Sequence, residues 1–133
     1  MWVRNDLIRQ ISILEAKSTK HTLWVKLHQS GKHKYFSVTY SNPNNRPQHE
    51  CIVNRLKQES EGIDEVVHIG DFNSRFTSIG DSSNNSYGTV LQQGLLEDFE
   101  IMRNMARHKW TYKSSTGKSI IDLVLTRPRS KVC

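Results

Sequence analysis

Glu65-Val66-Val67-His68-Ile69-Gly70-Asp71-Phe72-Asn73 is the stretch of sequence that decides the fold. Its first part is short, rich in β-branched residues and largely apolar, which is typical of a buried strand. Gly70 permits a sharp bend and a close approach of the backbone. Asp71 and Asn73 then follow at the carboxyl end of the strand, where ligands bind in α/β sheets. The stretch therefore predicts a buried strand of an α/β sheet with polar side chains at its end.

Asp71 and Asn73 are residue types that hydrolysis of a phosphodiester requires. A carboxylate orients or deprotonates the attacking water, and a neutral donor stabilises the charge that develops on the phosphate oxygens. The same residues are also typical of an Asx-turn that closes a strand, which is the commoner use of a strand followed by Gly-Asp. The local sequence leaves both interpretations open.

Upstream of this stretch, alternating apolar and polar residues predict an antiparallel hairpin. Strands are expected at 23–27 and 35–40, with a turn at Gly31-Lys32, and a short earlier strand is expected at 11–14. The other expected elements are a loop at 42–47, a helix at 48–60, an exposed loop at 71–88, a short helix at 89–93, and strands at 110–112 and 120–125 joined by a polar turn at 113–118.

Tyr40 ends the second hairpin strand and is followed closely by Asn42, Asn44 and Arg46. A phenol, two amides and a guanidinium that project together can hold phosphate oxygens. A surface turn with its usual residues is the alternative interpretation.

Asp122 lies within the apolar strand expected at 120–125. If its carboxylate is buried it needs a cation, a metal or a histidine as partner, because an unpaired buried charge is costly. If the strand is half exposed, Asp122 faces water while Ile121 and Leu123 share the opposite face. The sequence does not decide between the two.

The net charge of +6 is unevenly distributed along the chain. Residues 1–45 carry 7 Lys/Arg against 2 acids (+5), residues 46–100 carry 4 against 10 (−6), and residues 101–133 carry 8 against 1 (+7). Basic flanks around an acidic middle suit a protein that grips a polyanion and also holds a metal cation. A solvated surface of uneven charge is the alternative.

Several function classes are not favoured by the sequence. No stretch approaches the roughly 18 apolar residues of a membrane-spanning helix, and charged residues interrupt any signal-like run at the start. Cys51 and Cys133 suggest no disulfide framework. We therefore expect the protein in the nucleus or cytoplasm, not secreted and with no membrane partner.

Histidine-based metal binding and nucleotide binding are also not predicted. The histidines form no HxH or HExxH pattern, and each is expected to be a surface residue or a buried one with satisfied hydrogen bonds: His21, His28, His33, His49, His68 and His108. Gly117-Lys118-Ser119 is similar to the end of a P-loop, but Tyr112 stands where the first glycine belongs and a strand follows instead of a helix.

Taken together, three segments resemble one family. They are Tyr40 with Asn42-Pro43-Asn44, the strand that ends in Gly70-Asp71-Phe72-Asn73, and Thr111-Tyr112 followed by Ser119-x-x-Asp122 in a hydrophobic strand. Their order and type are similar to the endonuclease/exonuclease/phosphatase superfamily, and most of all to the apurinic-type endonuclease domain of non-LTR retrotransposons. Residues 2–7 also resemble a segment that precedes the central strands there, so the resemblance covers nearly the whole chain.

The resemblance implies a fold and a set of roles. The fold would be α/β, a partial two-sheet β-sandwich flanked by helices (four-layer α/β/β/α type) with the N-terminal strands missing, and residues 1–133 would form a single partial domain. The implied roles are activation of water by Asp71, contact with the scissile phosphate by Asn73, phosphate contact or transition-state support by Tyr40, orientation of a histidine by Asp122, and substrate binding by Asn44, Arg46 and Ser119. The spacing around Pro43 differs from the family by one residue, which affects the transfer to Asn44 and Arg46.

The family also implies Mg²⁺ as cofactor, nucleic acid (DNA first) as partner, and a reverse transcriptase domain on the same chain of a full-length element. The asparagine and the Mg²⁺-binding glutamate of its early strands would precede Met1, and its Ser-Asp-His segment would follow Cys133. We therefore expect Mg²⁺-dependent phosphodiester hydrolysis that is absent or very weak in this chain alone. The alternatives are a catalytically dead fragment that binds nucleic acid weakly and a phosphatase or phosphodiesterase of the same superfamily with another substrate.

Overall fold

The computed structural model describes residues 10–102, 112–114 and 117–127. In chain order its elements are β1 (Ile11–Ile13), β2 (Thr22–Gln29), β3 (Lys32–Tyr40), α1 (Arg46–Glu59), β4 (Val66–Asp71), the 3-10 helix η2 (Thr77–Ile79), α2 (Ser86–Gly94), β5 (Glu100–Ile101), β6 (Tyr112–Ser114), β7 (Gly117–Ser119) and β8 (Asp122–Thr126). None of the described helices is long and apolar enough to cross a membrane.

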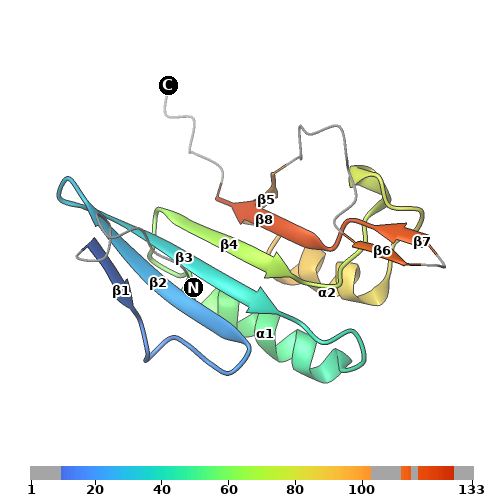
Figure 1. Cartoon of the computed structure of the whole chain (residues 1–133), viewed down its shortest axis with the longest axis horizontal. Helices are drawn as coiled ribbons and strands as arrows, with labels where there is room; N and C mark the ends of the chain where they lie inside the picture. The colour runs from blue at the N-terminus through green and yellow to red at the C-terminus, as the bar shows by residue number, and fades with distance from the viewer. Residues whose placement is uncertain (1–9, 103–111, 115–116, 128–133) are drawn as a thin grey trace.

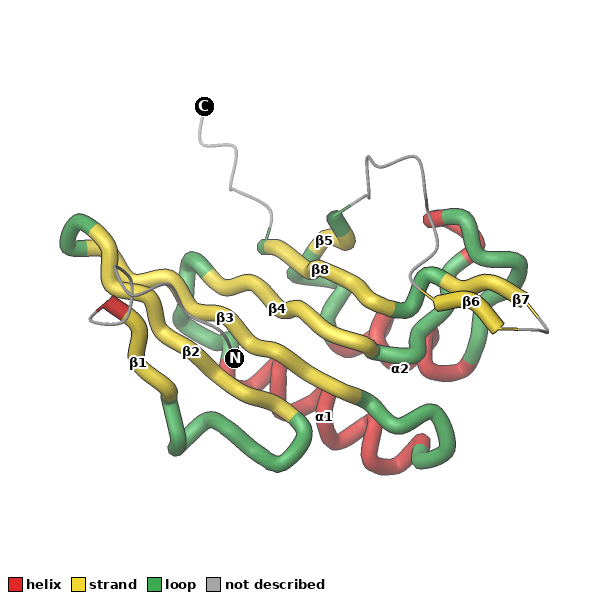
Figure 2. The backbone as a smooth tube through the Cα atoms, viewed as in Figure 1, coloured by secondary structure: helices red, strands yellow, loops and turns green. Residues whose placement is uncertain are grey.

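One six-stranded sheet organises the fold, with the strand order β1-β2-β3-β4-β8-β5, and β6 and β7 pair separately as a two-stranded sheet (Figure 2). β3 and β4 are parallel because α1 connects them as a crossover, whereas the other neighbours in the large sheet are antiparallel. Both α1 and α2 lie on one side of this sheet (Figure 1). The predicted α/β class is confirmed.

The sheet face toward the helices is closed. Trp24, Ser37, His68 and Leu125 form one row in register across β2, β3, β4 and β8, and each of them is 0% exposed. Apolar side chains of the two helices complete this core: Ile52, Val53, Leu56 and Leu91. Burial of this apolar surface is the main force that holds the helices on the sheet.

A histidine lies in the middle of this core with all its hydrogen-bonding capacity used. His68 Nδ1 is 2.6 Å from Ser37 Oγ, and its Nε2 is 2.9 Å from Ser60 Oγ at the end of α1. Burial, with a smaller effect of the Arg127 charge, lowers the pKa of His68 to about 4. His68 therefore stays neutral at physiological pH, as expected for a buried histidine whose partners are hydroxyl groups.

The opposite face of the sheet is open in the part of the chain that the structure describes. Leu23, Val38, Ile69 and Val124 form a second row in register, and Val38 and Ile69 remain 43% and 37% exposed. Neither α1 nor α2 covers this row (Figure 1). An apolar face of this kind suits the packing of one sheet on another, as the predicted sandwich requires.

Gly70 is required by the close approach of two strands, as the sequence suggested. A Cβ atom at this position would collide with the carbonyl oxygen of Thr39 on β3. Since Gly70 pairs with Thr39 in the parallel ladder, any side chain here would push β3 and β4 apart just before Tyr40 and Asp71.

Several predicted element boundaries were wrong. Helix α1 begins at Arg46, two residues earlier than predicted, because Asn45 caps it and Pro47 is accommodated in its first turn. The central strand continues through Asp71, and β8 begins only at Asp122. The described residues of the predicted turn at 113–118 belong to the paired strands β6 and β7, and the short strand β5 was not predicted. Residues 110 and 111 of one predicted strand lie outside the described residues.

The prediction that residues 71–88 form an exposed loop was also wrong, because part of this segment is buried. Phe72, Phe76, Asp81 and Tyr87 are all buried, and α2 begins at Ser86. The segment folds back on itself because its polar side chains bond to the backbone: Asp81 accepts from Phe76 N and from Ile120 N, the latter at 3.0 Å. Its polar composition therefore reflects internal hydrogen bonds as well as exposure to solvent.

Candidate active site

Three of the sequence-predicted site residues lie side by side in one row of the sheet. Tyr40, the last residue of β3, is the register partner of Asp71 on β4, and Asp71 in turn pairs with Asp122 on β8. Register partners project from the same face, so the phenol and both carboxylates point to the face that the helices leave open. The row borders the apolar row of Val38, Ile69 and Val124 on that face.

The structure decides whether the Asp122 side chain is buried or faces water. Its side chain is exposed, whereas Ile121 and Leu123 are 5% and 3% exposed. The carboxylate therefore stands on the open face at the start of β8, and the interpretation of a buried Asp122 was wrong. The alternation of burial along β8 is that of a half-exposed strand.

Asp71 lies at the centre of the row, and the pKa of its carboxyl group is shifted by its surroundings. Partial burial raises the pKa of its carboxyl group, and the neighbouring charge of Asp122 raises it further. The backbone N–H of Asn73 opposes this shift, because it donates to Asp71 Oδ1 at 3.1 Å and stabilises the ionised form. Because burial is the largest of these effects, the pKa of Asp71 is raised overall, and its carboxyl group binds a proton more readily than that of an ordinary aspartate.

Asn73 is fixed beside Asp71 by an unusual backbone conformation. Its φ of 47° lies in the left-handed region, which asparagine tolerates better than most residues. Its side-chain Nδ2 donates to the carbonyl oxygen of Ser41 at 2.6 Å, which ties the end of β4 to the loop after β3. The hydrogen bond from Asn73 N to Asp71 has the form of the Asx-turn considered above, so the turn and a functional site coexist.

Asn85, which the sequence analysis did not identify, connects the loop that carries Asn73 to the start of α2. Asn85 caps α2 by accepting from Gly88 N at 2.8 Å, accepts from Arg75 N at 2.9 Å, and donates to the carbonyl oxygen of Asn73 at 2.7 Å. Asn85 thus couples the start of α2 to the loop that carries Asn73. An asparagine three residues before a glycine at a helix start is the capping signal that could have identified it.

A second buried network positions the loop after β3. His49 Nδ1 is 2.6 Å from Ser41 Oγ, and the His49 ring stacks on Tyr87 at 4.1 Å between ring centroids. The Tyr87 hydroxyl donates to the carbonyl oxygen of Asn42 at 2.8 Å and accepts from Asn45 N at 2.9 Å. Both buried histidines are therefore satisfied, as predicted for His49 and His68.

Among the described side chains of the other predicted site residues, those of Asn44 and Arg46 form no hydrogen bond or ion pair with the row. Asn44 is exposed in the loop after Tyr40, and its backbone N–H donates to Asn42 Oδ1 at 2.9 Å. Arg46 opens α1, and its exposed guanidinium forms an ion pair with Glu50 at 3.3 Å. Ser119 ends β7, where its backbone pairs with Tyr112.

The row offers part of a site for a hard divalent cation. Asp71 and Asp122 are carboxylates on adjacent strands, and carboxylate oxygens are ligands that Mg²⁺ prefers. Within the described ranges, however, no three His, Cys, Asp or Glu side chains gather into a metal-binding group. Asp71 and Asp122 therefore fit such a cation without completing its coordination.

The fold is similar to several solved structures. The endonuclease domain of TRAS1, a telomere-specific non-LTR retrotransposon, matches with a TM-score of 0.77 at 16% identity, covering 93% of this chain and 57% of that one. TDP2 from D. rerio, complexed with a single-strand DNA product, matches with 0.57 at 15% identity, covering 94% and 56%. Beta toxin from Staphylococcus aureus with bound magnesium ions matches with 0.57 at 15% identity, covering 81% and 42%.

These likenesses show a shared fold at low identity, and the chain spans little more than half the length of the TRAS1 and TDP2 chains. No curated protein matches the sequence. The model of the endonuclease-reverse transcriptase family matches residues 34–133, which include β4 and β8 and most of β3, with the whole Tyr40–Asp71–Asp122 row. Because this match takes in most of the sequence, the chain belongs to the endonuclease-reverse transcriptase family.

Proposed function

We propose that the chain carries part of a Mg²⁺-dependent site that hydrolyses phosphodiester bonds in nucleic acid, with DNA as the first candidate. The row of Tyr40, Asp71 and Asp122 across three neighbouring strands is the observation that carries the proposal. Family membership supports a retroelement endonuclease, with a reverse transcriptase domain on the same polypeptide. The DNA product in the TDP2 structure and the magnesium ions in the beta-toxin structure support the substrate and the cofactor.

Each residue of the site has a role that its surroundings support. Asp71, whose pKa is raised, accepts a proton from the attacking water or orients it. The Tyr40 hydroxyl, on a side chain that is 55% exposed, donates to a phosphate oxygen. Asn73 Oδ1 accepts no hydrogen bond from the described residues and helps to hold the water, while its Nδ2 stays bound to Ser41.

Asp71, at the end of β4, and Asp122, at the start of β8, would hold the cation on the open face of the sheet. When bound, Mg²⁺ supplies Lewis acidity that stabilises negative charge on the phosphate oxygens. Since the described residues bring no third carboxylate to the row, we expect the cation to be held weakly and cleavage by the chain alone to be slow at most.

Nicking of supercoiled plasmid tests the proposal. The chain is incubated with plasmid in Mg²⁺ or in EDTA, alongside Asp71→Asn and the matched control Asp64→Asn, an exposed acid away from the row. Any nicking is expected to be slow, to require Mg²⁺, to fall at least about a hundredfold in Asp71→Asn, and to be unchanged in Asp64→Asn. Nicking that persists in Asp71→Asn would place the activity elsewhere.

A further inference from the structure

The peptide group between Ser41 and Asn42 connects the loop after β3 to the candidate active site. Its carbonyl oxygen accepts from Asn73 Nδ2 at 2.6 Å, and the backbone N–H of Ser41 donates to the carbonyl oxygen of Asp71 at 2.9 Å. Because a carbonyl oxygen can only accept, the Asn73 carboxamide turns its NH2 group to this peptide and keeps Oδ1 as the end that accepts. The place of this one peptide group therefore sets the orientation of the Asn73 side chain.

His49 holds the Ser41 side of this peptide group. It lies in the first turn of α1 and is 0% exposed, with Nδ1 2.6 Å from Ser41 Oγ and Nε2 3.1 Å from the carbonyl oxygen of Tyr87. Since that carbonyl oxygen needs a donor, Nε2 carries the proton and Nδ1 accepts from the Ser41 hydroxyl. Burial, as the largest effect, lowers the pKa of His49 and keeps the imidazole in this neutral form at physiological pH.

Tyr87 holds the Asn42 side of the same peptide group. Its hydroxyl donates to the carbonyl oxygen of Asn42 at 2.8 Å, and its ring stacks on the His49 ring at 4.1 Å between centroids and 18° between planes. His49 therefore reaches the residues on both sides of the peptide, Ser41 by a hydrogen bond and Asn42 through the stacked phenol. A buried network whose hydrogen bonds are satisfied favours one arrangement of the groups that it joins.

We propose that His49 is a positioning residue of the candidate active site. It fixes the Ser41–Asn42 peptide group, which keeps the NH2 group of Asn73 bound and leaves Oδ1 to accept from a partner in the site. An acceptor selects a partner with a proton to donate, which a water molecule has and an ionised phosphate oxygen lacks. That Asn73 holds the attacking water rests on the proposed function, whereas the control of its orientation by His49 does not.

Two substitutions of His49 separate its two hydrogen bonds. An asparagine side chain ends near the place of Nδ1, so His49→Asn keeps an acceptor for the Ser41 hydroxyl. A glutamine side chain ends near the place of Nε2, so His49→Gln keeps only a donor for the Tyr87 carbonyl. The readout is the side-chain NH2 signal of Asn73 in the ¹⁵N-labelled chain, which Asn73→Asp identifies by its absence.

Exchange of the Asn73 NH2 protons with solvent is measured by transfer of saturation from water. We expect slow exchange in the parent and in His49→Asn, and exchange at least about fivefold faster in His49→Gln, as the weakening of one hydrogen bond predicts. Recovery in His49→Asn distinguishes the bond to Ser41 from the presence of an imidazole ring.

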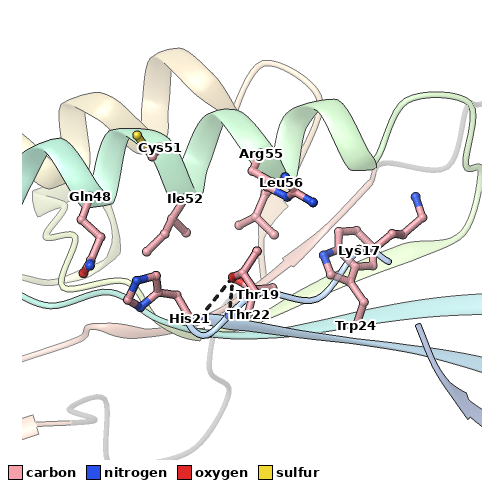
Figure 3. Close-up of a pocket in the computed structure, with 10 residues that line it drawn as sticks. All are labelled: Lys17, Thr19, His21, Thr22, Trp24, Gln48, Cys51, Ile52, Arg55 and Leu56. Atoms are coloured by element: carbon pink, nitrogen blue, oxygen red, sulfur yellow. Dashed lines mark hydrogen bonds between the residues drawn. The ribbon is translucent and has the colours of Figure 1, made fainter. Parts of the chain in front are cut away.

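Two control substitutions separate positioning from a general loss of stability. His68→Gln changes the other buried histidine, whose partners are hydroxyl groups elsewhere in the core. Gln48→Ala changes the neighbouring residue on α1, and Figure 3 shows Gln48 pointing toward His21, into a pocket beside β2. Both are expected to leave the Asn73 NH2 exchange at the parent rate, and urea unfolding measures the stability of every variant.

Three results would overturn the proposal. They are equal exchange at Asn73 in the parent and His49→Gln, equal acceleration in His49→Asn and His49→Gln, and an exchange rate that follows the unfolding free energy across all variants, His68→Gln included. If His49→Gln does not fold, Ser41→Ala removes the same hydroxyl bond and must accelerate the exchange in its place. Because no readout here depends on cleavage, failure of the parent to nick plasmid contradicts the proposed function and not this inference.

Discussion

At the residue scale, Asp71 shows a conflict between stability and function. Its pKa is raised, so the folded chain binds the proton more tightly than the unfolded chain does. The corresponding stability is fully present below the ordinary aspartate pKa of about 3.9 and is lost as the pH rises through the higher folded value. At neutral pH the folded state therefore carries a carboxylate in unfavourable surroundings, as active sites commonly do.

Replacing Asp71 by asparagine is expected to abolish activity without loss of stability. In Asp71→Asn the amide oxygen of the new side chain can still accept from Asn73 N, so the turn is kept while the charge and its repulsion with Asp122 are removed. We expect an unfolding free energy at pH 7 equal to or above that of the parent, with the difference vanishing below about pH 4. Urea unfolding at both pH values measures this, and a clear loss of stability at pH 7 would contradict it.

His68 gives a second prediction at this scale, in which the free energy of unfolding depends on pH in the opposite direction. Its folded pKa of about 4 lies below the ordinary value of 6.5, so the unfolded chain binds the proton first. The stability that neutral His68 provides is complete above pH 6.5 and is lost as the pH falls toward 4, by about 3 kcal/mol. Urea unfolding from pH 7 to pH 4 should show a smaller decrease in His68→Leu than in the parent. Parallel curves for the two chains would contradict the prediction.

At the scale of elements, the sequence predicted strands better than it predicted loops. Period-two alternation located β2, β3 and β8 to within a few residues, because alternate side chains of these strands face a closed core and an open face. The prediction of an exposed loop at 71–88 failed because the sequence does not show whether a polar side chain is solvated by water or accepts from a backbone N–H. Asp81 and Asn85 are of the second kind.

The site was predictable only in part for the same reason. Gly70, Asp71 and Asn73 form a local pattern, whereas the pairing of Tyr40 with Asp71 depends on a parallel ladder across α1. Asp122 reaches the row through pairing between residues far apart in the sequence. The resemblance to a known family supplied this long-range information, which local patterning does not contain.

Asn85 offers a prediction at the scale of elements. In Asn85→Ala the cap of α2 and the bond to the Asn73 carbonyl are both lost, so we expect a loss of about 1–2 kcal/mol and altered amide signals at Asn73. Asn84→Ala is the matched control, because the Asn84 side chain accepts from Thr77 N and Oγ1 and makes no bond to the Asn73 loop. Equal effects of the two substitutions on the Asn73 signal would show that Asn85 does not position the site.

At the scale of the whole molecule, the described part of the chain has one closed and one open face. The helices occupy the closed side, and the Tyr40–Asp71–Asp122 row stands on the open side beside an apolar row. The TRAS1 domain is longer than this chain, which covers 57% of it. An element packed on the open face would cover Val38 and Ile69 and enclose the row at the same time.

The central claim, that the row is a cation-assisted site, is tested most directly by Mn²⁺, a paramagnetic substitute for Mg²⁺. Millimolar Mn²⁺ is titrated into the ¹⁵N-labelled chain, into Asp71→Asn and into Asp64→Asn. The account predicts that the amide signals of Tyr40, Asp71 and Asp122 broaden first, that Asp71→Asn loses this preference, and that Asp64→Asn keeps it. Broadening spread evenly over the exposed acids, or unchanged by Asp71→Asn, would contradict it.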